Sequence, residues 1–187
     1  FYRVRFNEKA QFESLFDKRA GREVLRTGQA GNVLMTYEDK PHNFDAWDLN
    51  NYYTEKSWEM DQVSGVEVLE QGPVRTVIRV TRPYLSSTCV QDIIFYERHP
   101  RIDFETKIDW HEHQIFVKAL FPVDIQASEA TYEIQYGHVT RPTHYNTSWD
   151  FARFEVCHHK WLDFSEAGYG VSVLNDCKYG ASVHDGV

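Results

Sequence analysis

The residues of this sequence that could do chemistry begin with acidic side chains placed beside tryptophan. In two of these groups a close pair of acids flanks the ring, Asp45-Ala46-Trp47-Asp48 and Asp109-Trp110-His111-Glu112. Paired carboxylates catalyse glycoside hydrolysis. An acid beside an indole can also bind a sugar, because the ring stacks on the sugar's C–H groups while the carboxylate accepts hydrogen bonds from its hydroxyls. The alternative is that each Trp fills the core while its acids face water. We expect this structural role for 109–112, which ends a regular strand, and both interpretations stay open for 45–48.

Histidine pairs are the second candidate for chemistry, at His111-Glu112-His113 and His158-His159. On a strand, the first pair would share one face and the second would divide between two faces. A zinc site needs three or four converging ligands, and neither spacing provides them. We therefore expect a solvated hairpin end at 111–113, and one ring inside and one outside at 158–159.

Arrangements typical of a catalytic nucleophile are absent from the sequence. The run 180–184 is not a GxSxG elbow, and Cys157 directly precedes a histidine, which is poor geometry for a dyad. The three cysteines are an odd number without close pairing, so a reducing, cytoplasmic setting is the simplest interpretation. Cys89 and Cys177 are expected to be small buried hydrophobic residues.

The elements that must position these residues are strands, because apolar residues recur with a period of two almost everywhere. The clearest run is 101–110, whose alternating apolar face is expected to point inward. Strands are expected at 1–6, 11–16, 32–38, 66–71, 74–84, 86–97, 101–110, 114–121, 128–137, 151–158 and 168–175. Two polar segments with aromatic residues, 39–58 and 138–150, break the pattern and are expected to be loops that bind a ligand.

Short turns separate these strands, including hairpin turns expected at 71–73 and 99–101. No stretch of a dozen residues shows a helical period. The expected fold class is all-β, a large antiparallel β-sandwich that forms a single domain over residues 1–187. Because the sequence starts without Met in what looks like the middle of a strand, we expect a fragment of a longer chain.

The charge balance excludes several classes of function. The chain has 20 basic and 28 acidic residues, a formal net charge of −8. This argues against nucleic acid, whose phosphates need a basic surface, and against an anionic membrane surface. No apolar run approaches the roughly 18 residues of a membrane span. A neutral ligand such as a sugar is compatible with this balance.

Several long motifs resemble the family 38 α-mannosidases, in particular their cytosolic and bacterial branch. The motifs are Phe44-Asp45-Ala46-Trp47-Asp48-Leu49, the run from Arg141 to Asp150, Ala152–Val156, Trp161–Glu166, Gly168–Val171 and Leu174–Gly180. The opening residues 13–17 and 21–25 are also similar, so the resemblance covers nearly the whole chain.

The resemblance implies the C-terminal β-domain of such an enzyme, with a galactose-mutarotase-like super-sandwich fold that is truncated here. It implies a retaining exo-α-mannosidase that acts on α-mannoside oligosaccharides. An N-terminal α/β catalytic domain would contain the nucleophile, the acid/base and the ligands of a divalent cation. That cation would be zinc or cobalt. This chain would pack on that domain, help to close the substrate cleft, and be inactive alone.

Within the chain, the resemblance implies that the loop with Asp45, Trp47 and Asp48 contacts the sugar. Further substrate-binding candidates, with a purely structural role as the alternative, are Arg141, His144, Asn146 and Asp150. Two other functions stay open: a stand-alone carbohydrate-binding module, suggested by the two loops with Trp, and an aldose-1-epimerase-like enzyme, suggested by the fold class and by His111, Glu112 and His113. A homo-oligomer is also compatible with the sequence.

Overall fold

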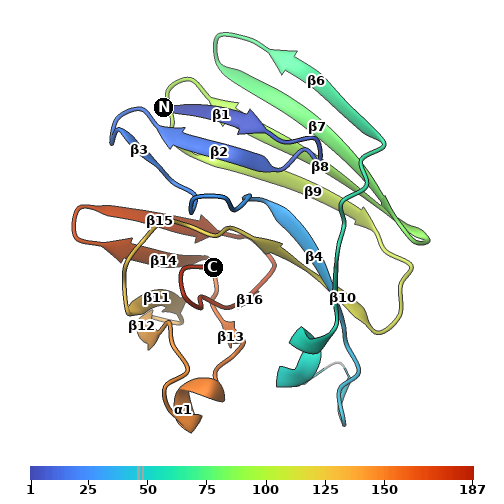
Figure 1. Cartoon of the computed structure of the whole chain (residues 1–187), viewed down its shortest axis with the longest axis vertical. Coiled ribbons are helices and arrows are strands. Elements are labelled where there is room, and N and C mark those ends of the chain that lie inside the picture. Colours follow the sequence, from blue (N-terminus) through green and yellow to red (C-terminus); the bar gives the residue numbers. More distant parts are fainter. Residues whose placement is uncertain (46, 48) are drawn as a thin grey trace. The chain divides into compact units, whose positions relative to one another are not determined.

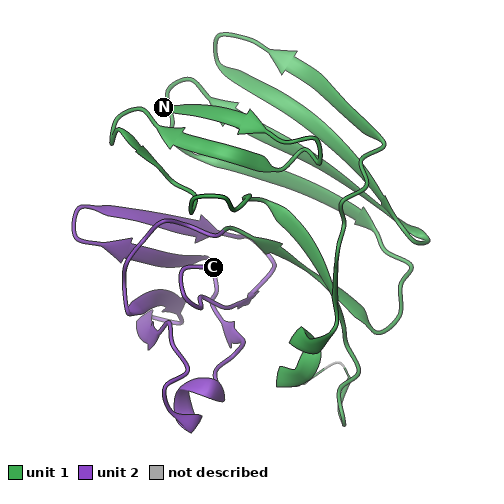
Figure 2. Cartoon of the chain, viewed as in Figure 1, with its two compact units in different colours: residues 1–121 green, residues 122–187 purple. Residues whose placement is uncertain are grey.

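The computed structural model describes residues 1–45, 47 and 49–187. It divides the chain into two compact units, Phe1–Phe121 and Pro122–Val187, drawn in green and purple in Figure 2. Regular structure in the described residues is nearly all strand, and the strand pairs are antiparallel, which confirms the expected all-β class. A single sandwich over residues 1–187 stays a prediction, because the structure defines the two units separately.

The largest sheet of the first unit contains four consecutive strands (Figure 1). In order across the sheet they are β6 (Gly65–Gln71), β7 (Arg75–Tyr84), β8 (Ser87–Tyr96) and β9 (Ile102–Asp109). The turns expected at 71–73 and 99–101 connect β6 to β7 and β8 to β9, so both predictions are confirmed.

One face of this sheet carries apolar residues in register. Ile78, Ile93 and Phe104 are neighbours across three strands, and Ile93 is fully buried. The expected inward face of 101–110 is buried only toward its start, since Ile108 is 41% exposed. The physical reason is that other rings cover only the start of this face, where the Phe104 centroid lies 5.8 Å from that of Phe12 and 5.4 Å from that of Phe121.

A second sheet of the first unit packs on this face through aromatic residues. Its strands are β1 (Tyr2–Phe6), β2 (Phe12–Asp17) and β3 (Arg22–Glu23). Phe12 is completely buried, and its ring centroid lies 6.1 Å from that of Phe95 and 5.8 Å from that of Phe104. Such rings bury large apolar areas, so this contact forms a centre of the core and joins two sheets face to face.

A third sheet contains β10 (Ile115–Leu120), β4 (Val33–Glu38) and β5 (Ser57–Glu59). Its core cluster consists of Leu34, Met60 and Cys89, so the prediction that Cys89 is buried is confirmed. The segment 39–58 is not a loop throughout, because it ends with the 3-10 helix η1 (Asn51–Glu55) and with β5.

The second unit is built on a sheet in the order β12 (Gly137–Pro142), β11 (Glu129–Ile134), β14 (Trp161–Glu166) and β15 (Tyr169–Leu174). Tyr132, Leu162 and Phe164 point to its buried face. The short helix α1 (Ser148–Phe151) and the pair β13 (Val156–Cys157) with β16 (Gly180–Ala181) complete the unit. Neither α1 nor η1, the helices of the described residues, has the length and apolar character to cross a membrane.

Several sequence predictions are wrong in the second unit. Residues 137–142 form β12 instead of starting a loop, because they pair with β11. The strand expected at 151–158 is reduced to β13, and β14 has no counterpart among the expected strands. The sequence signal of β12 is weak because Val139 is its one apolar side chain besides Pro142. The strand β14 was missed although Leu162 and Phe164 alternate with Asp163 and Ser165. Cys177 is exposed, not buried, since it lies in the turn that follows β15.

Candidate functional site

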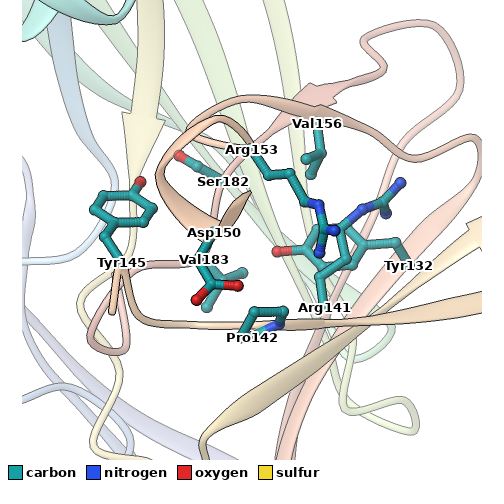
Figure 3. Close-up of a pocket in the computed structure, with 9 residues that line it drawn as sticks. All are labelled: Tyr132, Arg141, Pro142, Tyr145, Asp150, Arg153, Val156, Ser182 and Val183. Carbon is teal, nitrogen blue, oxygen red and sulfur yellow. The ribbon is translucent and has the colours of Figure 1, made fainter. Parts of the chain in front are cut away.

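A small polar pocket lies beside α1 in the second unit (Figure 3). The residues that line it come from β11, β12, α1 and the segments around β13 and β16: Tyr132, Arg141, Pro142, Tyr145, Asp150, Arg153, Val156, Ser182 and Val183. Its free space is about 10 Å³, which is roughly the room one water molecule needs. The pocket can therefore take a water or a single hydroxyl, but not a whole sugar ring.

Arg141 on β12 provides a half-buried cationic group at this pocket. Its guanidinium carbon lies 5.0 Å from the centroid of the Tyr132 ring, a cation–π distance. Within the described residues, Arg141 Nη1 is buried and has no hydrogen-bond partner. Tyr132 is 2% exposed, and burial raises the pKa of its hydroxyl to about 12. The phenol therefore stays protonated near neutral pH, and Arg141 keeps one donor for a ligand atom.

Asp150 provides the carboxylate of the pocket. It lies in the first turn of α1, where hydrogen bonds with the N-cap residue Thr147 hold it in place. Its Oδ2 accepts from Thr147 N at 3.1 Å and from Thr147 Oγ1 at 2.8 Å. The Asp150 amide donates to Thr147 Oγ1 at 3.2 Å, which completes a capping box. This cap fixes the direction of the carboxylate, which Figure 3 shows among the residues that line the pocket.

The structure brings the predicted residues of the 141–150 segment together only in part. Arg141 and Asp150 line the pocket. His144 contacts Asp150, with 3.7 Å between Nδ1 and Oδ2. Asn146 is exposed. Its backbone N–H donates a hydrogen bond to His144 Nδ1 at 3.4 Å, and this is how Asn146 contacts the residues around the pocket.

The predicted loop with Asp45, Trp47 and Asp48 belongs to the first unit. Trp47 is 90% exposed, so it does not fill the core, and its amide donates to the Phe44 carbonyl at 2.7 Å in a turn. Asp45 is also exposed, and Asp48 lies outside the described residues. Burial, and then the charge of Asp45, raise the pKa of the nearby Asp39 carboxyl.

The histidine pairs do not form a metal site. His111 and His113 are exposed, as expected for a hairpin end. Glu112 between them accepts from Ser86 N and Ser87 Oγ, both at 2.8 Å, and so has a structural role. In the part of the chain that the structure describes, no group of three or more His, Cys, Asp and Glu side chains is placed to hold a metal ion.

The sequence did not indicate Tyr132, Arg153 or Ser182 as members of the pocket. Tyr132 resembles any other core residue of a strand, and Ser182 lies 50 positions further along the chain. Tyr145 could have been found, since it lies between His144 and Asn146. Its ring stacks on the His184 ring with centroids 4.0 Å apart.

Comparison with known proteins gives a match over the whole chain. The family described as "Glycosyl hydrolases family 38 C-terminal domain" matches residues 1–187. Alpha-mannosidase 2C1 of Homo sapiens is 40% identical over 187 residues, which cover 99% of this chain and 18% of that protein. Alpha-mannosidase G of Dictyostelium discoideum is 41% identical over 192 residues, with 100% and 18% covered. The chain thus spans 18% of the length of these relatives.

A solved structure supports the fold independently of sequence. The crystal structure of an alpha-mannosidase from Enterococcus faecalis V583 matches with a TM-score of 0.79 over 100% of this chain and 24% of that chain. The identity is 14%, so this comparison shows a shared fold and nothing more. Together, these matches confirm the family resemblance of the sequence motifs.

Proposed function

This chain belongs to the C-terminal domain family of the family 38 glycosyl hydrolases, and we propose on that premise that it is part of a longer α-mannosidase. The longer enzyme removes terminal α-D-mannosyl residues with retention of configuration. The observation that carries this proposal is the family match over residues 1–187, together with 40% identity to a human protein named Alpha-mannosidase 2C1.

The catalytic groups are proposed to lie in a preceding domain. Retaining glycosidases need a carboxylate nucleophile and a carboxyl acid/base about 5 Å apart, and a bound zinc or cobalt ion would polarise substrate oxygens. The described residues of this chain do not fit such an ion, because they contain no cluster of three or more potential ligands. We therefore assign the cation to residues outside this chain, and we place the nucleophile and the acid/base there because the family resemblance implies it.

The proposed contribution of this chain is to pack on the catalytic domain and to help close the substrate cleft. The exposed Trp47 ring and the Asp45 carboxylate are suited to contact a sugar, since an indole face covers C–H groups and a carboxylate accepts from hydroxyls. Asp48 is part of the same proposal. Arg141 and Asp150 can hold one hydroxyl or water between them, and His144 and Asn146 support that pocket from outside.

The proposed setting of the longer enzyme is the cytoplasm. Three cysteines without a disulfide among them fit a reducing compartment. Substrates would be α-mannoside oligosaccharides, and self-association into a homo-oligomer is part of the same proposal.

The experiment that tests this function compares two proteins on an aryl α-mannoside. The longer protein, supplied with zinc or cobalt, is expected to release the aryl group, and the 187-residue chain is expected to give no rate above buffer. Turnover by the chain alone would overturn the assignment of catalysis to another domain. A longer protein that is folded, carries metal and gives no turnover would overturn the α-mannosidase proposal itself.

The role of the 44–48 loop is tested in the longer protein with Trp47→Ala. The KM for an α-mannoside should rise roughly fivefold with little change in kcat, because a stacking contact worth about 1 kcal/mol is lost. Tyr136→Ala is the control, since Tyr136 is a fully exposed aromatic residue in the turn between β11 and β12. Equal KM values for the two variants would remove Trp47 from the substrate site.

A further inference from the structure

We propose that the exposed face of the β12-β11-β14-β15 sheet binds a neutral pyranose unit of an oligosaccharide. This site is separate from the pocket beside α1 and shares no residue with it. It requires no catalytic activity, so it goes beyond the proposed function.

A shallow groove of about 470 Å³ lies on this face. Its lining is polar and includes Ser128, Glu129, Thr131, Thr140, Asp163 and Ser165. The volume falls within the range of about 300–1,000 Å³ that small-molecule sites occupy, but such sites are usually lined by apolar residues. A groove with hydroxyl and carboxylate walls instead suits a ligand that is itself covered with hydroxyl groups.

The strand register places four polar side chains in one row across this face. Thr140 pairs with Thr131, Thr131 with Asp163, and Asp163 with Ser172. Directly opposed residues of antiparallel strands point to the same face, and neighbouring strands lie about 4.8 Å apart. A pyranose ring that lies on the row can therefore reach two or three of these side chains at once.

The carboxylate in the middle of the row is held in a fixed position. Ser165 Oγ donates to Asp163 Oδ2 at 2.7 Å, and Ser172 Oγ donates to Oδ1 at 2.6 Å. Each carboxylate oxygen retains a lone pair for a further donor. Gly170 keeps this arrangement possible, since a Cβ at Gly170 would collide with Ser165 Oγ. Asp163 is thus ready to accept from ligand hydroxyls without reorganisation.

The wall formed by residues 126–128 is fixed as well. Gln126 N donates to Glu166 Oε2 at 2.7 Å, and Thr143 N donates to the Ser128 carbonyl at 3.0 Å. Within the described part of the chain, the hydroxyls of Thr131 and Thr140 take part in no hydrogen bond and are available to a ligand.

Charge restricts the class of ligand. Two carboxylates, Glu129 and Asp163, line the groove, and among the described residues no Lys or Arg side chain does. Phosphate and carboxylate ligands are therefore repelled, whereas a neutral hydroxyl donor is attracted. Metal binding is the competing possibility, but the described residues hold no set of three potential ligands here.

An aromatic ring lies next to the row. Trp161 is two positions before Asp163 on β14, so it points to the same face. It is half-buried, and its ring centroid lies 6.5 Å from that of His138 on β12. A polar row beside an indole offers both hydroxyl partners and a surface for the C–H groups of a sugar.

The test photolabels the longer protein that contains this chain with a diazirine-bearing α-mannoside, and maps the modified peptides by mass spectrometry. We expect saturable labelling at residues 126–131, 138–140 or 161–172, competed by methyl α-D-mannopyranoside or methyl α-D-glucopyranoside and unaffected by EDTA. Labelling of a catalytic centre would appear in other peptides. Hydrolysis of an aryl α-mannoside by the same preparation reports separately on the proposed function.

A matched pair of variants ties the labelling to the groove. Thr131→Val with Thr140→Val removes two hydroxyls without changing side-chain shape, and should lower labelling of these peptides roughly tenfold. Thr88→Val, at an exposed position on β8, should leave it unchanged. The proposal is overturned if these peptides are not labelled, if free methyl glycosides do not compete, or if EDTA abolishes labelling. Competition on the unmodified protein decides the matter even where the double variant fails to fold.

Discussion

Arg82 is the most deeply buried cationic side chain that the structure describes, at 1% exposure. Its guanidinium donates to the carbonyl oxygens of Lys9 at 2.7 Å, Ala10 at 3.2 Å and Met60 at 3.3 Å. Burial lowers the pKa of Arg82 below its usual range. Its role is to connect the turn before β2 and the end of β5 to β7, since it satisfies backbone acceptors that the sheets leave unpaired.

Arg82→Met is therefore expected to lower the free energy of unfolding by about 3 kcal/mol, because three buried carbonyls lose their donor at about 1 kcal/mol each. Chemical denaturation measures the loss. Arg79→Met is the matched control on the same strand, since Arg79 pairs with Asp92 at 2.7 Å on the partly exposed face. That pair should contribute less than about 1 kcal/mol. Equal losses for the two variants would contradict the proposed role.

His158 is the buried member of its histidine pair, as the alternation predicted, and is 2% exposed. The Asn175 amide nitrogen lies 2.8 Å from Nε2, so Nε2 accepts and the ring proton is on Nδ1. Burial lowers the pKa of His158 below its usual 6.5, with a smaller effect of the same sign from His159, while the Tyr179 backbone and Glu133 act in the opposite direction. The folded protein thus favours the neutral ring.

A lowered pKa makes stability depend on pH in one direction. Below about pH 6.5, His158 takes up a proton in the unfolded chain but stays neutral in the folded chain. The free energy of unfolding therefore falls as the pH decreases. We expect the urea midpoint to drop between pH 7.5 and pH 5.5, and to drop less in His158→Gln. His138→Gln, at an exposed position, should behave like the parent. A midpoint of H158Q that falls as steeply as the parent's would exclude His158 as the source.

At the scale of elements, α1 shows how one short helix builds a site. It has only four residues and no buried side chain, so its position depends on the capping box between Thr147 and Asp150. The same Asp150 lines the pocket with Arg141. The Asp150 carboxylate therefore both stabilises the start of α1 and lines the pocket. It has this structural role whether or not it also contacts a substrate.

Thr147→Ala should lower the free energy of unfolding by about 1 kcal/mol, the usual value of an N-cap side chain. The thermal midpoint measures this effect. Ser148→Ala is the control, because Ser148 is the adjacent exposed residue and is not the cap. A midpoint for T147A no lower than that of S148A would show that the cap does not hold α1.

At the scale of the whole molecule, the first unit has an edge strand, β6, with exposed apolar side chains. Val66 and Val68 on β6 are 56% and 62% exposed, and Val74 in the following turn is 69% exposed. Exposed edges with apolar side chains promote association, although the bulge between Val68 and Glu70 disturbs the regular edge. The net charge of −8 opposes association.

Val68→Lys should reduce concentration-dependent self-association of the 187-residue chain, because a charge replaces an apolar group on the edge. The free energy of unfolding should change by less than about 0.5 kcal/mol, since the position is exposed. Sedimentation velocity measures the association. Thr88→Lys adds the same charge on β8, where Thr88 is exposed, and should have a smaller effect. If T88K acts as strongly, net charge and not the β6 edge controls association.

The sequence by itself determined the strands in which apolar and polar residues alternate along the chain. In β7 and β9 the apolar positions repeat about every second residue, and short turns separate these strands from β6 and β8, so the elements and both hairpins were predictable. The family motifs at 44–49 and 141–180 were also readable from sequence alone, because a motif is a property of neighbouring residues. By contrast, β12 was missed because it has few apolar residues, and β14 was missed although Leu162 and Phe164 alternate with Asp163 and Ser165.

Only the tertiary structure decided which distant residues meet. Tyr132, Arg141 and Ser182 share one pocket, and Thr140, Thr131, Asp163 and Ser172 share one row. The reason is that strand register and burial set these meetings, and a shift of one residue would turn every side chain of a strand to the opposite face. Local alternation therefore specified the elements of this protein, whereas the pairing of its strands specified its candidate sites.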